Sequence, residues 1–549
     1  MLCPMPKQTL SMETRDRTRL DADVYYPDVP GEYPVLLMRQ PYGRAIASTV
    51  VYAHPSWYAA QGYIVVIQDV RGRGSSAGEF RLFADEVADG YDAVQWAAHL
   101  PGSTGEVGMY GFSYQGMTQL YAAASKPPAL KTICPAMVAY DLYADWAYEG
   151  GAFCYQLNLG WAIQLAAETA RRAGDADTYK TLYAAARNPD LRDPVCPRSE
   201  LLERLEPHSF YHDWLHNPDP QAEYWKTLSP TYILKDVDLP MLHIGGWFDT
   251  YLRGTMRLYR AIASRSQYPQ HLWVGPWAHL PWGRRAGVMD YGPEASSPID
   301  ELQIRWFDHF LKGKNTGIGN ANPVCFFDLG SYQWRNFSAY PEGSIQEFWL
   351  GSDGLAAMGD RHGILIPTNT AQEIPAAIDT LVHDPWRPVP VLGGHATVPA
   401  GVGDRASLDT RTDVLTYTTP CLEAPLTLAG DLSVELMCAT DASSFDLCAV
   451  LSEVKPDGRV LAFSQGYIRI ETATPHAIIP IQISLQSTCM SLPVGSALRL
   501  SVSAACSPAY AVNPGTGTPP ADSSLMQAQV ITIQLHTGQG AVSKVNLSS

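Results

Sequence analysis

The sequence lacks the features of several protein classes. No apolar run approaches the length of a membrane-spanning helix. The segment from Met1 to Lys7 has no apolar core of signal-peptide length. Ten cysteines are scattered without a Cys-x-x-Cys pair, so neither a zinc motif nor a redox motif is indicated. We therefore expect a soluble, cytoplasmic protein that uses no metal and no other cofactor.

Positive charge is also scarce. There are 39 Lys and Arg residues against 55 Asp and Glu residues, which gives a net charge of −16. This balance disfavours nucleic acid and anionic membranes as partners. The glycine-rich loop at 69–76 lacks the Gly-Lys-Ser/Thr ending of a phosphate-binding loop, so nucleotide binding is rejected there. Its side chains Arg71 and Arg73 are expected to form ion pairs that order the loop.

A chain of 549 residues is too long for one hydrophobic core. Near the N-terminus, apolar strand candidates at 34–39 and 63–68 alternate with helical patterns at 55–61 and 83–99. Such alternation predicts a mainly parallel sheet. An aromatic, helical segment interrupts it, and short β-rich runs dominate after about residue 350. We predict the class α/β, with an α/β domain at 1–140 and 240–350, a helical cap at 141–239, and an all-β domain, sandwich or jelly roll, at 351–549.

The residues Gly111 to Gly116 read Gly-x-Ser-x-Gly around Ser113. An extended approach precedes them and an Ala-rich, helix-compatible run follows, which is the context of a nucleophile elbow. The glycines let the strand and the helix approach closely, and the strained turn lifts the Ser113 hydroxyl clear of the sheet. The backbone N–H of Tyr114 would then lie at a helix N-terminus, ready to donate to an oxyanion.

Acyl transfer by a serine needs a base and an acid that orients the base. Asp249 follows the strand candidate at 240–248, and His279 follows the next one at 270–278. The order Ser, Asp, His is that of an α/β-hydrolase. Of fourteen histidines, only His279 follows a strand downstream of such an acid. We predict Ser113 as nucleophile, His279 as base and Asp249 as its orienter, and no spacing suggests a metal hydrolase instead.

Several short motifs lie along the chain: Arg39-Gln40-Pro41-Tyr42, Asp69-Val70-Arg71-Gly72, Gly111-Phe112-Ser113-Tyr114-Gln115-Gly116, Gly246-Trp247-Phe248-Asp249, Gly275-Pro276-Trp277-Ala278-His279, Asp384-Pro385 and Asn513-Pro514-Gly515-Thr516-Gly517. On these motifs the chain resembles the cocaine esterase-like and X-Pro dipeptidyl-peptidase-like (S15) serine hydrolases over nearly its whole length. The resemblance implies an α/β-hydrolase domain, a helical cap between its halves, and a C-terminal jelly roll packed against both. It also implies an oxyanion hole made of the Tyr42 hydroxyl and the Tyr114 N–H, whereas the residues alone would make Tyr42 an ordinary turn aromatic.

Relatives of this kind split into esterases, amino-ester hydrolases or acylases, and X-Pro peptidases. The amino-ester branch holds the substrate ammonium with acids just after the triad aspartate, but here Thr250-Tyr251-Leu252-Arg253 follows Asp249. Asp141, Asp145 and Glu149, near the start of the cap, could still supply a counter-charge. The aromatic cap suits a bulky, largely uncharged acyl group. The side chains expected to line this pocket are Trp146, Phe153, Trp161 and Tyr251.

We therefore expect a hydrolase of carboxylic esters that works through an acyl-enzyme on a small-molecule substrate. X-Pro dipeptidyl-peptidase or amide hydrolysis is the second interpretation. A non-catalytic binding protein with a lectin-like β domain is disfavoured because the full set of catalytic residue types is present. The simpler role of the β domain is to close one wall of the acyl pocket and to offer a surface for a homodimer.

Overall fold

The structure is a computed structural model of the chain and describes residues 7–45, 49–368 and 374–549. Residues 1–6, which include Cys3 and most of the segment expected not to be a signal peptide, lie outside the described residues. No helix within them is long and apolar enough to cross a membrane.

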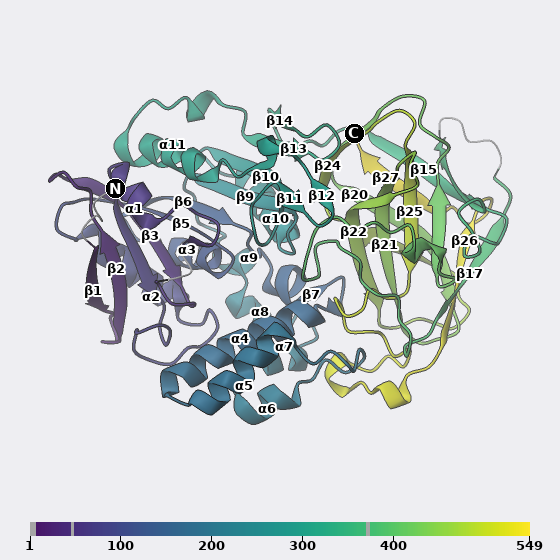
Figure 1. Cartoon of the computed structure of the whole chain (residues 1–549), viewed down its shortest axis with the longest axis horizontal. Coiled ribbons are helices and arrows are strands. Elements are labelled where there is room, and N and C mark those ends of the chain that lie inside the picture. Colours follow the sequence, from purple (N-terminus) through teal and green to yellow (C-terminus); the bar gives the residue numbers. More distant parts are fainter. Residues whose placement is uncertain (1–6, 46–48, 369–373) are drawn as a thin grey trace.

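A ten-stranded sheet forms the first half of the molecule (Figure 1). Its strands, in spatial order, are β1 (Lys7–Glu13), β2 (Arg19–Tyr25), β4 (Ile64–Asp69), β3 (Tyr33–Gln40), β5 (Ser103–Phe112), β6 (Leu130–Ala136), β9 (Met241–Phe248), β10 (Gln270–Ala278), β13 (Val324–Asp328) and β14 (Gln333–Phe337). From β4 to β13 all neighbours are parallel. The carboxyl ends of β3, β5, β9 and β10 therefore meet at one edge, where ligands bind in open α/β sheets.

Helices cover both faces of this sheet because its central strands are apolar on both sides. Leu37 of β3 packs in the same core as α2 (Glu86–Ala98) and α3 (Tyr114–Ala124). Its neighbours Leu36 and Met38 point to the opposite face, into the core shared with α1 (Pro55–Ala60) and α11 (Ile299–Lys312). Helix α10 (Leu252–Ala263) follows β9 and packs on β9 and β10. The predicted parallel α/β arrangement is confirmed.

The segment between β6 and β9 forms a helical layer, seen at the bottom of Figure 1. It begins with a π-helical turn, η2 (Tyr143–Ala147), and a small hairpin, β7 (Tyr148–Glu149) and β8 (Ala152–Phe153). Its helices are α4 (Tyr155–Ala173), α5 (Ala176–Arg187), α6 (Glu200–Leu205), α7 (Phe210–His216), α8 (Glu223–Leu228) and α9 (Pro230–Ile233). Helix α4 ends at Gly174, whose φ of 76° allows the left-handed cap.

The second half of the chain consists mostly of β-strands, at the right of Figure 1. An eleven-stranded sheet combines β15 (Ile345–Ser352), β16 (Gly363–Pro367), β17 (Ala377–His383), β18 (Val414–Thr418), β20 (Leu432–Thr440), β21 (Phe445–Val454), β22 (Val460–Ile470), β23 (Ile479–Ser484), β25 (Ala497–Ser503), β26 (Ile531–Thr537) and β27 (Lys544–Ser548). Strands β19 (Leu426–Gly430) and β24 (Thr488–Leu492) form a separate pair. The hairpin predicted at Asp457-Gly458 joins β21 to β22, with Gly458 at a φ of 90°.

The boundary predicted after residue 350 falls inside β15, which pairs with β16 and β27 of the second sheet. We therefore propose that the β domain begins before β15, and that the first 140 residues and 240–340 form the catalytic domain with 141–239 as the cap. The two halves interlock through backbone contacts: Tyr155 N–H donates to the Ala509 carbonyl at 2.9 Å, and Arg469 N–H donates to the Gly150 carbonyl at 2.8 Å.

Candidate active site

Ser113 occupies the sharp turn between β5 and α3. Its φ of 60° and ψ of −127° are strained for a residue with a side chain. Two glycines make this turn sterically feasible: Gly111 has a φ of 139°, and a Cβ on Gly116 would lie 2.4 Å from a Val138 methyl group. The strand, turn and helix predicted around Ser113 are therefore confirmed as local structure.

The side chain of Tyr114 anchors the start of α3 beneath this turn. Its hydroxyl donates to Glu86 Oε1 at 2.8 Å, and its ring stacks on Phe83 with centroids 4.7 Å apart. Arg39 Nη1 holds the other Glu86 oxygen at 2.5 Å. The backbone N–H of Tyr114 is at the first helical position, where no carbonyl of the same helix can accept from it. It is thus free to serve a group bound beside Ser113.

Asp249 and His279 stand at the ends of β9 and β10 and form a hydrogen-bonded pair. His279 Nδ1 lies 2.8 Å from Asp249 Oδ1. The second carboxylate oxygen of Asp249 accepts the Tyr251 N–H at 3.1 Å. The Asp249 side chain is fully buried, whereas that of His279 is 30% exposed. The ring of Phe112, the neighbour of Ser113, lies 5.4 Å from that of His279, so the three loops meet at one place.

Tyr42 follows β3 and reaches the same place. Its hydroxyl accepts a hydrogen bond from Trp161 Nε1 at 3.1 Å. Burial raises the pKa of Tyr42 to about 12, because the phenolate would lose its hydration; the nearby Trp161 and Ser113 side chains oppose this more weakly. The hydroxyl therefore keeps its proton at neutral pH and can donate to an anion beside Ser113.

Aromatic side chains wall this site on the side of the cap. The rings of Trp146 and Tyr251 lie 4.2 Å apart, and Tyr251 lies edge-on to His279 at 5.1 Å. Trp146 also packs on Trp161 at 5.1 Å. Trp146 belongs to the π-helical turn η2, a geometry that is found frequently at functional sites. Three of the four side chains expected to line the pocket are thus gathered around Tyr42 and His279.

Phe153, the fourth, is placed differently. It lies on β8 with no exposed surface, and its ring contacts are with Tyr148 at 5.2 Å and Tyr211 at 5.5 Å. These are contacts of the cap interior. Helical and strand periodicity could not separate a ring that faces the site from one that packs behind it.

Two of the three acids near the start of the cap are paired with arginines of α10. Asp145 forms an ion pair with Arg257. Glu149 lies 2.8 Å from Arg253 Nη1 and 2.9 Å from His395 Nε2. Burial alone would raise the pKa of the Glu149 carboxyl, but the charges of Arg253 and His395 outweigh it and bring the pKa down to about 2. Both carboxylates are therefore already neutralised within the protein.

The glycine-rich loop at 69–76 only partly meets expectation. Arg71 pairs with Asp16 and Asp89, as predicted. Arg73 forms no ion pair with any described residue, so that part of the prediction is wrong. Its guanidinium stacks 3.7 Å from the Phe80 ring centroid and donates to the Leu165 carbonyl at 3.1 Å. A planar guanidinium can be stabilised by an aromatic face and by backbone carbonyls instead of an acid. No sequence pattern indicates which of these partners Arg73 has.

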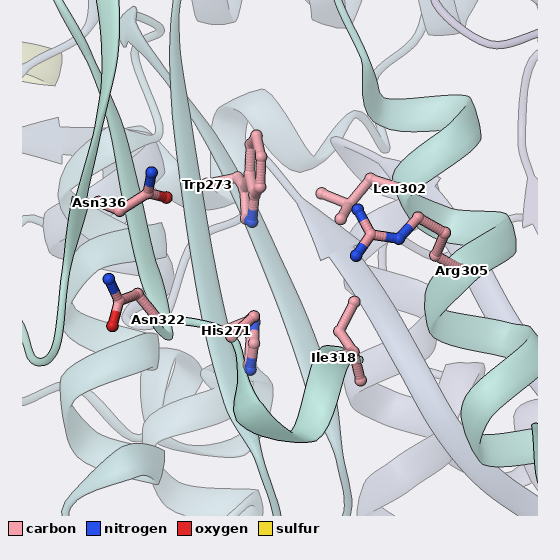
Figure 2. A pocket seen from close by; sticks show the side chains of 8 residues that line it. His271, Trp273, Leu302, Arg305, Ile318, Asn322 and Asn336 are labelled. Atoms are coloured by element: carbon pink, nitrogen blue, oxygen red, sulfur yellow. The ribbon is translucent and has the colours of Figure 1, made fainter. Parts of the chain in front are cut away.

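A cavity of about 300 Å³ lies elsewhere, between β10, α11 and β14. Figure 2 shows His271 and Trp273 of β10 between Arg305 on one side and Asn322 and Asn336 on the other. His279 lies six positions after Trp273, just beyond the end of β10, which is roughly 20 Å along an extended strand. Its polar rim side chains Arg305, Asn322 and Asn336 are exposed to solvent. This cavity is therefore separate from the predicted catalytic residues, and we assign it no role.

Sequence reasoning missed a contact from the β domain. Gln486, between β23 and β24, donates from Nε2 to the backbone carbonyl of Asp249 at 3.1 Å. It lies 237 residues further along the chain and in no recognisable motif. Only the packing of the two halves reveals it.

Two family models match the chain. The model described as X-Pro dipeptidyl-peptidase (S15 family) matches residues 16–281. The model described as the X-Pro dipeptidyl-peptidase C-terminal non-catalytic domain matches residues 312–545. Together they span the predicted catalytic residues, the helical layer between β6 and β9, and most of the β half.

Curated relatives and solved structures agree with this match. The chain is 31% identical over 551 residues to the cocaine esterase of Rhodococcus sp. (strain MB1 Bresler), covering 95% of each. It is 25% identical to a putative serine esterase of Mycobacterium bovis, covering 75% of this chain and 69% of that one.

Among solved structures, an aminopeptidase from a marine sediment Thaumarchaeota archaeon has a TM-score of 0.82 at 21% identity, covering 99% of this chain and 96% of that one. An α-amino acid ester hydrolase has a TM-score of 0.78 at 20% identity, with the same coverage. These two likenesses show the fold, a two-part α/β-hydrolase chain with a mostly β C-terminal domain. The family match and the full-length identity show that the chain belongs to the cocaine esterase-like and X-Pro dipeptidyl-peptidase (S15) family of serine hydrolases.

Proposed function

We propose that this protein hydrolyses carboxylic esters of bulky, largely uncharged acyl groups through an acyl-enzyme. The observation that carries the proposal is the hydrogen bond of 2.8 Å between His279 and the buried Asp249, beside an elbow serine and walled by aromatic rings. A relative that shares 31% identity over 95% of both chains is named a cocaine esterase, which supports ester hydrolysis here.

In this proposal each residue has one role. With Nδ1 held by Asp249, His279 presents Nε2 to Ser113 and takes its proton as Oγ attacks the ester carbonyl. The Tyr42 hydroxyl and the Tyr114 N–H donate to the carbonyl oxygen as it becomes negative. His279 then gives the proton to the leaving alcohol, which departs and leaves the acyl-enzyme. Water, deprotonated by His279, then attacks this ester. His279 returns that proton to Ser113 Oγ as its bond to the acyl carbon breaks, and the carboxylic acid is released.

The charges near the pocket favour a neutral acyl group. An ammonium group on the substrate would have to compete with Arg257 for Asp145 and with Arg253 for Glu149. Breaking the buried Glu149–Arg253 pair would leave one charge uncompensated, at a cost of about 3–5 kcal/mol. Arg257 is 46% exposed, so its pair with Asp145 costs less to break. Apolar acyl groups need no such exchange, because burial against Trp146 and Tyr251 supplies the affinity.

The test is hydrolysis of two chromogenic substrates by the wild type and by Ser113→Ala. One is an aryl ester with a bulky neutral acyl group, and the other is an X-Pro anilide. We expect turnover of the ester only, and its loss in Ser113→Ala with an unchanged unfolding temperature. Near wild-type turnover by Ser113→Ala would remove Ser113 from the mechanism.

Asp141 favours one alternative, the X-Pro dipeptidyl-peptidase activity. Among the residues that the structure describes, no arginine, lysine or histidine pairs with its carboxylate, which accepts the Ala144 N–H at 2.9 Å. If the anilide is the better substrate, Asp141→Asn should lower its kcat/KM and leave the neutral ester unaffected. An equal effect on both substrates would show that Asp141 only shapes the turn.

A further inference from the structure

The loop that carries Asp249 is held from the β domain as well as from its own sheet. Within the loop, Asp249 N–H donates to the Gly246 carbonyl at 3.0 Å, and the Asp249 carbonyl accepts the Leu252 N–H at a long 3.3 Å. The same carbonyl accepts Gln486 Nε2 at 3.1 Å. Gln486 therefore supplies the shorter of the two bonds to this peptide group.

Gln486 is itself rigidly placed. Its backbone N–H donates to the Gln465 carbonyl at 2.9 Å, and its carbonyl accepts the Ser464 hydroxyl at 2.6 Å. The residue is 2% exposed. Both partners lie on the long strand β22. The backbone of Gln486, whose side-chain amide contacts Asp249, is therefore fixed to the second sheet.

A second link ties the following helix turn to the same domain. Arg253, at the start of α10, contacts Glu149 at 2.8 Å. His395 and the Tyr510 hydroxyl, both from the β half, bond the same Glu149 carboxylate. The four residues from Asp249 to Leu252 are therefore bounded on both sides by contacts with the β domain.

We infer that Gln486 is a positioning residue for catalysis: from the β domain it sets the orientation of the Asp249 peptide, and through it the carboxylate that holds His279. The inference rests on the proposed serine-hydrolase function. Asp249 Oδ2 accepts the N–H of Tyr251, two residues on, at 3.1 Å, so a rotation of the peptide between them would disturb the carboxylate directly. The β domain would then be part of the catalytic apparatus and not only a wall of the pocket.

The test is Gln486→Met, which keeps the length of the side chain and removes its donor. The variant also removes the Gln486 Oε1, a buried acceptor without a partner among the described residues, so the unfolding temperature should not fall. We expect kcat for the neutral ester to drop about threefold to tenfold, the value of one hydrogen bond, with KM within about twofold. The downfield proton resonance of the His279 Nδ1–H, identified by its absence in His279→Ala, should shift or broaden.

Gln465→Met is the matched control. Gln465 lines the same small cavity as Gln486 and is also buried, but its amide bonds the Cys506 sulfur at 3.5 Å and does not touch Asp249. It should keep the wild-type kcat and the wild-type resonance. The inference is overturned if Gln486→Met keeps kcat and the resonance, or if both variants lose activity alike. An active Ser113→Ala would instead overturn the proposed function.

Discussion

At the scale of single residues, the position of Tyr42 supports its proposed role as an oxyanion donor. The Trp161 indole holds the Tyr42 hydroxyl, and burial keeps the proton on it. A backbone N–H such as that of Tyr114 always donates, but it supplies only one hydrogen bond. A tetrahedral oxyanion is best stabilised by at least two donors at fixed positions.

Tyr42→Phe should therefore lower kcat by about 10²–10³, because one oxyanion donor is lost while the ring still packs. Steady-state kinetics on the aryl ester measures this. The pKa of about 12 adds a pH test. Since the donor form persists below the pKa, activity should show no Tyr42-linked decline up to about pH 10, and wild type and variant should share one profile shape. An unchanged kcat would make Tyr42 a structural residue only.

At the scale of elements, the π-helical turn η2 links the sheet edge to the cap. It places Trp146 over Tyr251 and directs Asp145 away, to Arg257 and to the backbone N–H groups of Tyr140 and Asp141. The turn η2 thus places an aromatic ring beside Tyr251 and directs the Asp145 carboxylate away from it. This division of roles supports the proposed preference for neutral acyl groups.

Trp146→Leu should reduce selectivity for bulky acyl groups. Because contact area is lost only where a large acyl group would touch it, kcat/KM for a benzoyl-type ester should fall about tenfold to a hundredfold relative to an acetyl ester. The ratio is independent of the fraction of active protein. Phe153→Leu, in the cap interior, is the comparison and should leave the ratio as it is. A changed ratio in Phe153→Leu alone would place the acyl pocket deeper in the cap.

At the scale of the whole molecule, a buried polar cluster joins three parts of the chain. Glu149 comes from the cap, Arg253 from the catalytic domain, and His395 and Tyr510 from the β half. Nearby, Cys154 pairs with Tyr510 as an isolated β-bridge. The three parts are expected to unfold together, since none can keep this cluster paired alone.

Glu149→Gln should destabilise the protein by about 3–5 kcal/mol, because the Arg253 charge stays buried without its partner. Denaturant unfolding at neutral pH measures this. The folded pKa of Glu149, about 2, is below its ordinary 4.5, so the stability it contributes is present above about pH 4.5 and is lost as the pH falls toward 2. The difference from wild type should shrink over that range. Asp190→Asn breaks a solvent-exposed pair with Arg192 and should have no measurable effect.

The sequence by itself determined what depends on local order. The Gly-x-Ser-x-Gly turn, the strand before it and the helix after it follow from residues within about ten positions, so Ser113 could be placed without a structure. The sequence also showed Asp249 and His279 after strands, and parallel strands bring their carboxyl ends to one edge. The role of Tyr42 needed the family resemblance, because a turn tyrosine carries no distinguishing pattern.

Only the tertiary structure decided the contacts between distant segments. Glu149 pairs with Arg253 and His395. Arg73 has no acidic partner among the described residues and stacks on Phe80. Phe153 packs in the cap interior against Tyr211. The tertiary structure also brought Gln486 to the Asp249 carbonyl across 237 residues. Such contacts depend on how whole layers pack and on which side chain fills each space, and no local period or motif encodes that.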